Sequence, residues 1–320
     1  MGKYAIGIDV GGTNSKIGLF DSEMHPLNVI NTLTDKELEA DQLLDILASQ
    51  AEQLMKEHGL TRADIRGVGA AFPSFIDYKN GVVLETSNII SLTDQPIRDM
   101  LSDRLKLPVW LDNGANCAAL AEHELGAGRG HDDMIYATIA TGIGGALIIN
   151  GKLYRGMHGM AGEIGHMFIS DSTGYPCSCG VTGCVQSISS GVHMARYVTD
   201  RIKEGVDSRI LEHAGTMSNI DMMAVGKALN TGDSLALEVV NRGAEYLGRM
   251  FFSLNQIFDI NIFIYGGGIT KLGSKFIDRM IAAYRHYSLN DQRYPAQFIP
   301  AKLGDQASVY GAALLLDQHE

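Results

Sequence analysis

The pattern that most constrains the fold is a strand, a glycine turn and a second strand, and it occurs once in each half of the chain. Near the start, Y-A-I-G-I-D-V (4–10) leads into G-G-T and then into K-I-G-L-F-D (16–21). From residue 134, M-I-Y-A-T-I-A-T leads into G-I-G-G and then into A-L-I-I-N. Short apolar runs bounded by glycine are typical of buried strands. We therefore predict a duplicated lobe; the alternative is that a hairpin this common recurs by chance.

The segments around these hairpins alternate between helical and strand patterns. Helices are predicted at 41–58, 95–106, 115–122, 190–204, 221–230, 233–257, 274–286 and 307–316, and strands at 26–33, 66–73, 108–111, 261–265 and 297–301. This order indicates an α/β protein with two lobes. We expect an N-terminal lobe of residues 1–114, on which the closing segment 304–320 packs back. The C-terminal lobe is expected to span 115–303, with an insertion at 151–190.

Composition limits the kinds of partner. A chain of 320 residues, 45% apolar and 20% charged, is globular and too long for one small core. The net charge of −11 argues against nucleic acid, because a protein that neutralises phosphates needs a basic face. No apolar stretch reaches the roughly 18 uncharged residues of a membrane span, and no positively charged leader precedes the first strand. We expect a cytoplasmic protein that binds neither nucleic acid nor membranes.

Three glycine-rich turns follow buried strands and suit the phosphates of a nucleotide. They are D-V-G-G-T-N-S-K (9–16), T-G-I-G-G (141–145) and Y-G-G-G-I-T (265–270). Glycines let backbone N–H groups approach phosphate oxygens, Thr13 offers a hydrogen bond and Lys16 a charge. Asp9 suits a Mg²⁺ held through water. None of the turns matches a P-loop or a Rossmann motif, and a plain hairpin is the alternative for each. Together they indicate two phosphate-binding turns and an adenosine pocket.

A histidine and three cysteines form the sharpest local pattern. G-E-I-G-H (162–166) is followed by C-S-C-G-V-T-G-C (177–184), which supplies one nitrogen and three sulfurs: His166, Cys177, Cys179 and Cys184. A Cys₃His set suits a structural, tetrahedral Zn²⁺. The first two cysteines are too close for an easy mutual disulfide, and four cysteines in the whole chain are too few for a disulfide scaffold. The alternative is coincident reduced thiols. Cys117 is expected to be a small core residue.

These motifs together resemble the ROK family of sugar kinases and related repressors, within the actin/hexokinase-like ATPase superfamily. The resemblance runs from D-x-G-G-T near the start to L-G-x-x-x-x-x-x-G-A-A at 303–313. The glycine motifs are shared across the superfamily, whereas the pair G-E-x-G-H and C-x-C-G-x-x-G-C is specific to ROK proteins. The resemblance implies a two-lobed, duplicated α/β fold of the actin-like and ribonuclease H-like type, with a zinc knuckle insertion and with ATP and a hexose in the cleft.

The resemblance also implies an activity, transfer of the γ-phosphoryl group of ATP to a hydroxyl of a hexose or N-acetylhexosamine, typically the 6-hydroxyl, by a homodimer. Its cofactors would be ATP, Mg²⁺ and structural Zn²⁺. The side chains implied to hydrogen-bond the sugar are Asn113, Glu163 and His166. The nucleotide would be served by Asp9, Gly11, Gly12, Thr13, Lys16, Thr141, Gly142, Gly144 and Gly267. Repressors of the family carry an N-terminal helix-turn-helix, but this chain starts at its first strand, so DNA binding is not expected.

One departure from the family pattern concerns the sugar. The family closes its zinc motif as G-C-x-E, and that Glu contacts the sugar near its anomeric end. Here the position is Gln186. Glutamine keeps an acceptor, adds a donor and loses a charge. We therefore expect Gln186 to bind the sugar with shifted specificity at that hydroxyl.

The second departure concerns the catalytic base. The family turn reads E-N-D-A-N, and its Asp takes the proton from the attacking hydroxyl, but L-D-N-G-A-N (111–116) has Gly114 there. Asp112 is a poor substitute, since two extended residues place it roughly 6.5 Å away. A base must lie within about 3 Å of its proton or act through one water. We expect sugar and ATP to bind, with transfer slowed by about 3 to 5 kcal/mol. A sugar-binding pseudokinase or sensor is the alternative.

Overall fold

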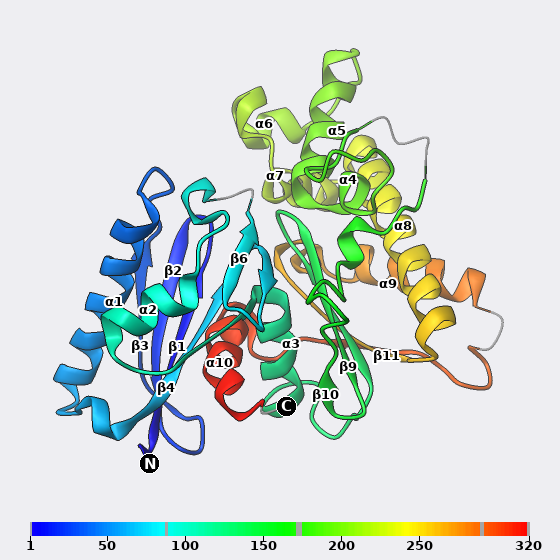
Figure 1. The fold of residues 1–320 in the computed structure, drawn as a ribbon. Helices are drawn as coiled ribbons and strands as arrows, with labels where there is room; N and C mark the ends of the chain where they lie inside the picture. Colours follow the sequence, from blue (N-terminus) through cyan, green and yellow to red (C-terminus); the bar gives the residue numbers. More distant parts are fainter. Residues whose placement is uncertain (1, 87–88, 171–174, 289–290, 319–320) are drawn as a thin grey trace. The chain divides into compact units, whose positions relative to one another are not determined.

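The computed structural model describes residues 2–86, 89–170, 175–288 and 291–318 (Figure 1). Contacts divide the chain into two compact units. Unit 1 comprises Met1–Asp132, Ala146–Gly162 and Lys302–Glu320, and unit 2 comprises Asp133–Gly145 and Glu163–Ala301. We predicted a boundary after residue 114, whereas in the structure the first unit continues to Asp132. The reason is that the helix after residue 114 packs against the C-terminal helix, which keeps both in unit 1.

Unit 1 is built on a five-stranded sheet of order β3-β2-β1-β4-β7. Its strands are β1 (Tyr4–Val10), β2 (Asn14–Phe20), β3 (Pro26–Leu33), β4 (Ile65–Phe72) and β7 (Val109–Asn113). β1 pairs antiparallel with β2 and parallel with β4, and β4 pairs parallel with β7. The carboxyl ends of β1, β4 and β7 therefore lie at one edge, where α/β sheets usually bind ligands.

Two helix pairs flank this sheet (Figure 1). On one side, α1 (Ala40–Glu57) packs on β2 and against α2 (Ile97–Leu105), and it buries Leu43, Leu44, Leu47, Ala51 and Leu54 at helical spacing. On the other side, α10 (Ala307–Leu314) packs on β1 and β4 and against α3 (Gly114–Glu124). The sheet is thereby buried on both faces.

Glycines allow α10 to lie directly on its neighbours. A Cβ atom at Gly69 of β4 would lie 1.7 Å from the carbonyl oxygen of Ala312. On the opposite side of the helix, a Cβ atom at Gly311 would lie 1.7 Å from the carbonyl oxygen of Cys117 in α3. No side chain fits at either contact. The C-terminal helix is thus held between sheet and α3 at backbone-to-backbone distance.

The second sheet has the order β10-β9-β8-β11-β12. Its strands are β8 (Met134–Ile139), β9 (Ile143–Ile149), β10 (Lys152–Leu153), β11 (Ile262–Gly266) and β12 (Gln297–Pro300). β10 pairs antiparallel with β9, and β11 pairs parallel with both β8 and β12. This order matches that of the first sheet strand for strand, and the unit boundary falls within β9. The predicted duplicated α/β fold is confirmed.

Unit 2 carries the longest described helix, α8 (Ser234–Phe258). This helix packs against α9 (Ser274–Tyr287), α5 (Gly191–Lys203) and α7 (Met222–Asn230). The sequence did not predict the short helices α4 (Gln186–Ser189) and α6 (Ile210–Ala214), nor the hairpin β5 (Phe75–Asp77)–β6 (Val82–Glu85) of unit 1. Such elements span too few residues to show a period. Within the described ranges, no helix is both long and apolar enough to cross a membrane.

Replacing Gly311 by Ala tests the close packing of α10. The added methyl group would overlap the Cys117 carbonyl, so we expect the free energy of unfolding to fall by about 1 to 3 kcal/mol. Thermal and denaturant unfolding measure this. Gly268→Ala is the control, because no heavy atom lies within 4 Å of its added methyl group. Equal stability of the two variants would contradict the packing described here.

Candidate active site

Asn113 lies at the junction of β7 and α3, where sequence analysis expected a sugar ligand. Its Oδ1 accepts the N–H of Ala115 at 2.7 Å, which caps α3, and its Nδ2 donates to the carbonyl oxygen of Ser74 at 3.1 Å. An amide has two N–H donors, so one is not used by the described residues. The cap and the Ser74 bond fix the side chain at the carboxyl edge of the sheet.

The carboxylate of Asp112 is buried, and both of its oxygens accept hydrogen bonds from the protein. Its side chain is 3% exposed, and its Oδ2 accepts from Nε of Arg155 at 2.6 Å. Its Oδ1 accepts the N–H of Asn113 at 2.8 Å and an N–H from Nδ2 of Asn116 at 2.7 Å. A carboxylate held this way is not placed to take a proton from a ligand, which is a second argument against it as the base. The sequence suggested neither the ion pair with Arg155 nor the burial.

Gly114 is the first residue of α3, and the structure leaves room there for a side chain. A Cβ atom would have Ser308 Oγ at 3.6 Å as its nearest contact, which is an ordinary van der Waals distance. The backbone of Gly114 is not in the left-handed region, so other residues can adopt it. A carboxylate at the start of a helix is also favoured by the helix dipole. Neither space nor backbone geometry therefore requires glycine at this position.

Asp9 lies next to the same point. Its Oδ1 accepts from Ser308 Oγ at 2.8 Å, so one serine lies between Asp9 and position 114. Burial raises the pKa of Asp9, while the Ser308 hydrogen bond and Lys16 lower it in part. Lys16 donates to the carbonyl oxygen of Asp305. Asp9 and Lys16 thus flank the turn of Gly11, Gly12 and Thr13 between β1 and β2, as the glycine motif predicts.

In unit 2, Gln186 connects a glycine turn to the cysteine loop. Its Oε1 accepts the N–H of Ile143 at 2.9 Å, next to Thr141 and Gly142 in the turn between β8 and β9 and to Gly144 at the start of β9. Its Nε2 donates to Ser178 Oγ at 3.2 Å. Glutamate could accept from Ile143 but could not donate to Ser178. The glutamine therefore has a bridging role that the sequence pattern alone did not suggest.

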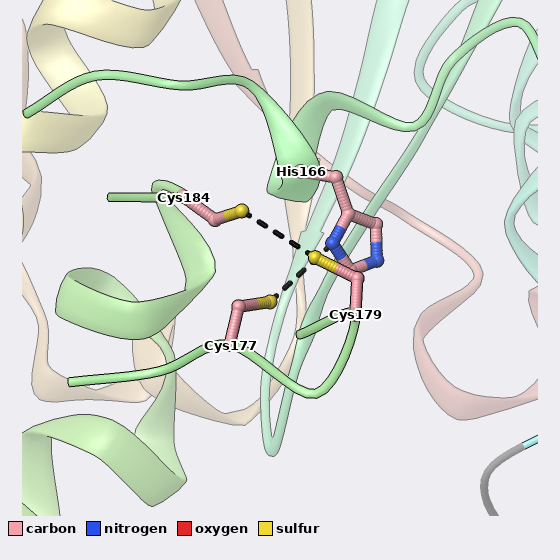
Figure 2. A group of neighbouring side chains, drawn as sticks. All are labelled: His166, Cys177, Cys179 and Cys184. Atoms are coloured by element: carbon pink, nitrogen blue, oxygen red, sulfur yellow. Dashed lines mark hydrogen bonds between the residues drawn. The ribbon is translucent and has the colours of Figure 1, made fainter. Parts of the chain in front are cut away.

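The predicted metal ligands lie together in unit 2 (Figure 2). The ligand atoms of His166, Cys177, Cys179 and Cys184 all lie within 4.8 Å of one another. Cys179 Sγ and Cys184 Sγ are 3.6 Å apart, so they are not bonded, and Cys177 Sγ is 3.4 Å from Nδ1 of His166. One nitrogen and three sulfurs at these distances could hold a Zn²⁺ ion.

Titration of the cluster reflects the crowding of its thiols. Burial, followed by the hydrogen bond with Cys179, raises the pKa of Cys184 to about 12. Burial also lowers the pKa of His166, which favours the neutral ring that binds metals. Glu163, whose carbonyl oxygen accepts the N–H of His166 at 3.0 Å, has its carboxyl pKa raised by burial. Three crowded thiols can all ionise only if a cation compensates their charge.

A cavity of about 540 Å³ in unit 2 lies beside two of the predicted nucleotide turns. Thr141 comes from the β8–β9 turn and Gly268 and Ile269 from the segment after Gly267, and the remaining wall includes Arg196 and Met222. Gly267 has φ +96°, and a Cβ atom there would lie 2.4 Å from the carbonyl oxygen of Ile139. This glycine is therefore required by the backbone. Arg196 and Met222 belong to helical patterns and carried no sequence signal for a ligand.

Comparison with known proteins fits this arrangement. The sequence model of the ROK family matches residues 5–319. The chain belongs to the ROK family. It is 32% identical to a glucokinase of Halalkalibacterium halodurans, over 99% of this chain and 96% of that protein.

Solved ROK structures share the fold. A ROK glucokinase from Streptomyces griseus, solved in complex with glucose and AMPPNP, is 32% identical, with a TM-score of 0.83 over 99% of this chain and 100% of that one. A ROK hexokinase from Thermus thermophilus is 31% identical, with a TM-score of 0.83 over 97% of each chain. The ROK scaffold is thus present almost end to end, with the glycine turns and the Cys₃His cluster in place.

Replacing Arg155 by Met tests the role of the Asp112 ion pair. The change leaves a buried carboxylate without its cation, so we expect the free energy of unfolding to fall by about 3 to 5 kcal/mol. Denaturant unfolding measures this. The double variant Asp112→Asn/Arg155→Met removes both charges and should regain part of the loss. If the double variant were no more stable than Arg155→Met, the unpaired Asp112 carboxylate would not be the cause of the lost stability.

Proposed function

We propose that this ROK chain binds a hexose or N-acetylhexosamine together with ATP and transfers the γ-phosphoryl group to the sugar 6-hydroxyl, slowly, because residue 114 offers no base. The observation that carries the proposal of slow transfer is the open space at Gly114, at the position where the family turn has its Asp. The similarity to glucokinases over almost the whole chain supports the substrate class. A cytoplasmic homodimer is part of the proposal.

The sugar roles rest on side chains held in place by the protein. Asn113, fixed by its cap and by Ser74, would donate its remaining N–H to a sugar hydroxyl. Glu163 and His166 would hydrogen-bond other hydroxyls. Gln186 would contact the sugar near its anomeric end, in addition to the bridge from Ile143 to Ser178. A substrate held at several hydroxyls is positioned for in-line attack, which is most of what phosphoryl transfer needs.

The nucleotide roles follow the glycine turns. The adenosine part of ATP would occupy the cavity of about 540 Å³, and the turns at Gly11–Gly12 and Gly142–Gly144 would bind phosphates through backbone N–H groups. Asp9 would hold a water of Mg²⁺, which neutralises charge on the phosphates when bound. Lys16 adds a positive charge beside the first turn.

Without a base at residue 114, the attacking hydroxyl would lose its proton late and to solvent. Transfer through a loose transition state depends mainly on positioning and on charge stabilisation, so turnover is reduced and not abolished. General base catalysis is worth about 10² to 10⁴-fold. If turnover is negligible, the same binding residues would serve a sugar sensor.

Restoring the acid provides the decisive test. We expect Gly114→Asp to raise kcat by about 10² to 10⁴-fold with a small change in sugar KM, because the residue acts on the reacting proton. An ATP-coupled assay over hexoses and N-acetylhexosamines measures this and identifies the sugar. Gly114→Asn is the matched control, since it adds the same bulk without a base. Equal, slow rates in all three proteins would contradict the base-loss account. Sugar binding without turnover, even in Gly114→Asp, would favour the sensor.

We also propose that the cluster of His166, Cys177, Cys179 and Cys184 binds one structural Zn²⁺ per chain. Cys177→Ser should lower zinc content measured by elemental analysis and lower the melting temperature. Zinc should also dissociate as the pH falls, because its ligands must be deprotonated. Cys117→Ala, a buried cysteine outside the cluster, should keep its zinc. Unchanged zinc content in Cys177→Ser would end the metal assignment.

A further inference from the structure

Unit 1 contains a second cavity, of about 350 Å³, to which the proposed reaction assigns no role. It lies between the β5–β6 hairpin, the start of α2, strand β7 and the C-terminal segment, and its wall includes Tyr78, Lys79, Arg98, Trp110, Arg155 and Leu315. Pockets of 300 Å³ and more are of the size that holds small metabolites. The volume thus admits a compact ligand of a few tens of atoms at most.

The charge of this cavity is opposite to that of the protein. Among the described residues that line it, three are cationic and none is acidic, in a chain of net charge −11. Three carboxylates near these cations are already engaged. Asp77 is held by Asn80 and interacts with the charge of Lys79, Asp99 lies 3.4 Å from Nε of Arg98 and is 69% exposed, and Asp112 is buried against Arg155. A concave site lined by one sign of charge raises the local concentration of counter-ions. The cavity therefore favours an anion.

The donors that face such an anion are partly unused. Among the described residues, Arg155 has a hydrogen-bond partner only at Nε, which leaves the N–H groups of its two terminal nitrogens. Its guanidinium lies 4.9 Å from the centre of the Tyr78 ring, which holds the plane in one orientation. Lys79 Nζ lies 5.7 Å from the centre of the Tyr78 ring, and among the described residues its charge acts on Asp77 without a close ion pair. Arginine forks bind phosphate in two-point fashion, and lysine adds a point charge.

The rest of the wall is aromatic and apolar. Tyr78 and Trp110 face the cavity with Val109, Leu111 and Leu315. β7 is the outer strand of its sheet, so one row of its backbone groups is not used by the sheet. A ligand that consists of charge alone would leave this surface unmatched. The lining suits an anionic group attached to a body with a flat or weakly polar face.

We propose that this cavity is a binding site for a phosphorylated small molecule, with the phosphate on Lys79, Arg98 and Arg155 and the body against Tyr78 and Trp110. The binding claim is independent of the proposed kinase activity. Arg155 also contacts Asp112, whose Oδ1 holds Asn113 and Asn116. A phosphate bound to Arg155 would therefore act, through Asp112, on the turn that carries residues 113 and 114.

The only tryptophan of the chain reports on this site directly. We would titrate the full-length protein with glucose 6-phosphate, AMP and inorganic phosphate and follow the emission of Trp110. The expected result is a saturable change with at least one of the two esters, and weaker binding of inorganic phosphate. The ester that binds more tightly identifies the body as a sugar or a nucleoside. Absence of any saturable change with either ester up to about 10 mM, where a site with a Kd of about 1 mM is mostly filled, would overturn the proposal.

A matched pair of variants separates this site from the proposed active site. Lys79→Gln should weaken ester binding by about tenfold, as expected for loss of one charge-assisted contact. Lys36→Gln, an exposed lysine before α1, should leave it unchanged. If the ester bound at the proposed sugar or nucleotide residues instead, its affinity would not change in Lys79→Gln. Equal affinities in the two variants would therefore overturn the assignment of the ester to this cavity. Affinity for inorganic phosphate equal to that for both esters would overturn the role of the aromatic wall.

Discussion

The buried carboxylate of Asp112 holds together three parts of unit 1: the end of β7, the start of α3 and the segment that carries Arg155. It accepts three hydrogen bonds from residues of these parts, and its burial makes each of them strong, because the local dielectric is low. Asn113 gains its orientation from the same arrangement. The side chain expected to bind sugar is therefore positioned by a neighbour whose own hydrogen bonds are all made within the protein.

The other end of α3 is fixed in a similar way. Glu122 is fully buried, and its oxygens accept the N–H groups of Ala127 at 2.8 Å, Lys302 at 3.0 Å and Leu303 at 2.7 Å. These bonds tie α3 to the segment that leads into α10. The backbone of α10 also lies directly against the backbones of α3 and β4. A shift of α3 along its axis would therefore break contacts at both ends of α3. Position 114 is thus set by a rigid helix and not by a loop.

The sequence predicted what depends on short separations along the chain. The glycine turns and the Cys₃His cluster involve residues at most 18 positions apart, from His166 to Cys184, and all of these were found in place. The duplication was likewise predicted from the two hairpins, although the strand order of the two sheets was not. The pairs Asp112–Arg155 and Ile143–Gln186 are each 43 residues apart, and neither cavity is formed by consecutive residues. Such contacts arise only after the chain has folded, so no local pattern indicates them.

Gly114 differs from Gly267, another glycine of the candidate site. At Gly267 the left-handed backbone and the Ile139 carbonyl exclude any side chain, whereas at Gly114 neither constraint applies. A residue that the fold does not demand can be changed without disturbing its surroundings, and an acid there would be favoured by the helix start. The proposed absence of a base at residue 114 is therefore a chemical property that can be separated from folding. We therefore expect an acid introduced at this position to add a proton acceptor while the turn, the cap of α3 and the Asp112 contacts stay the same.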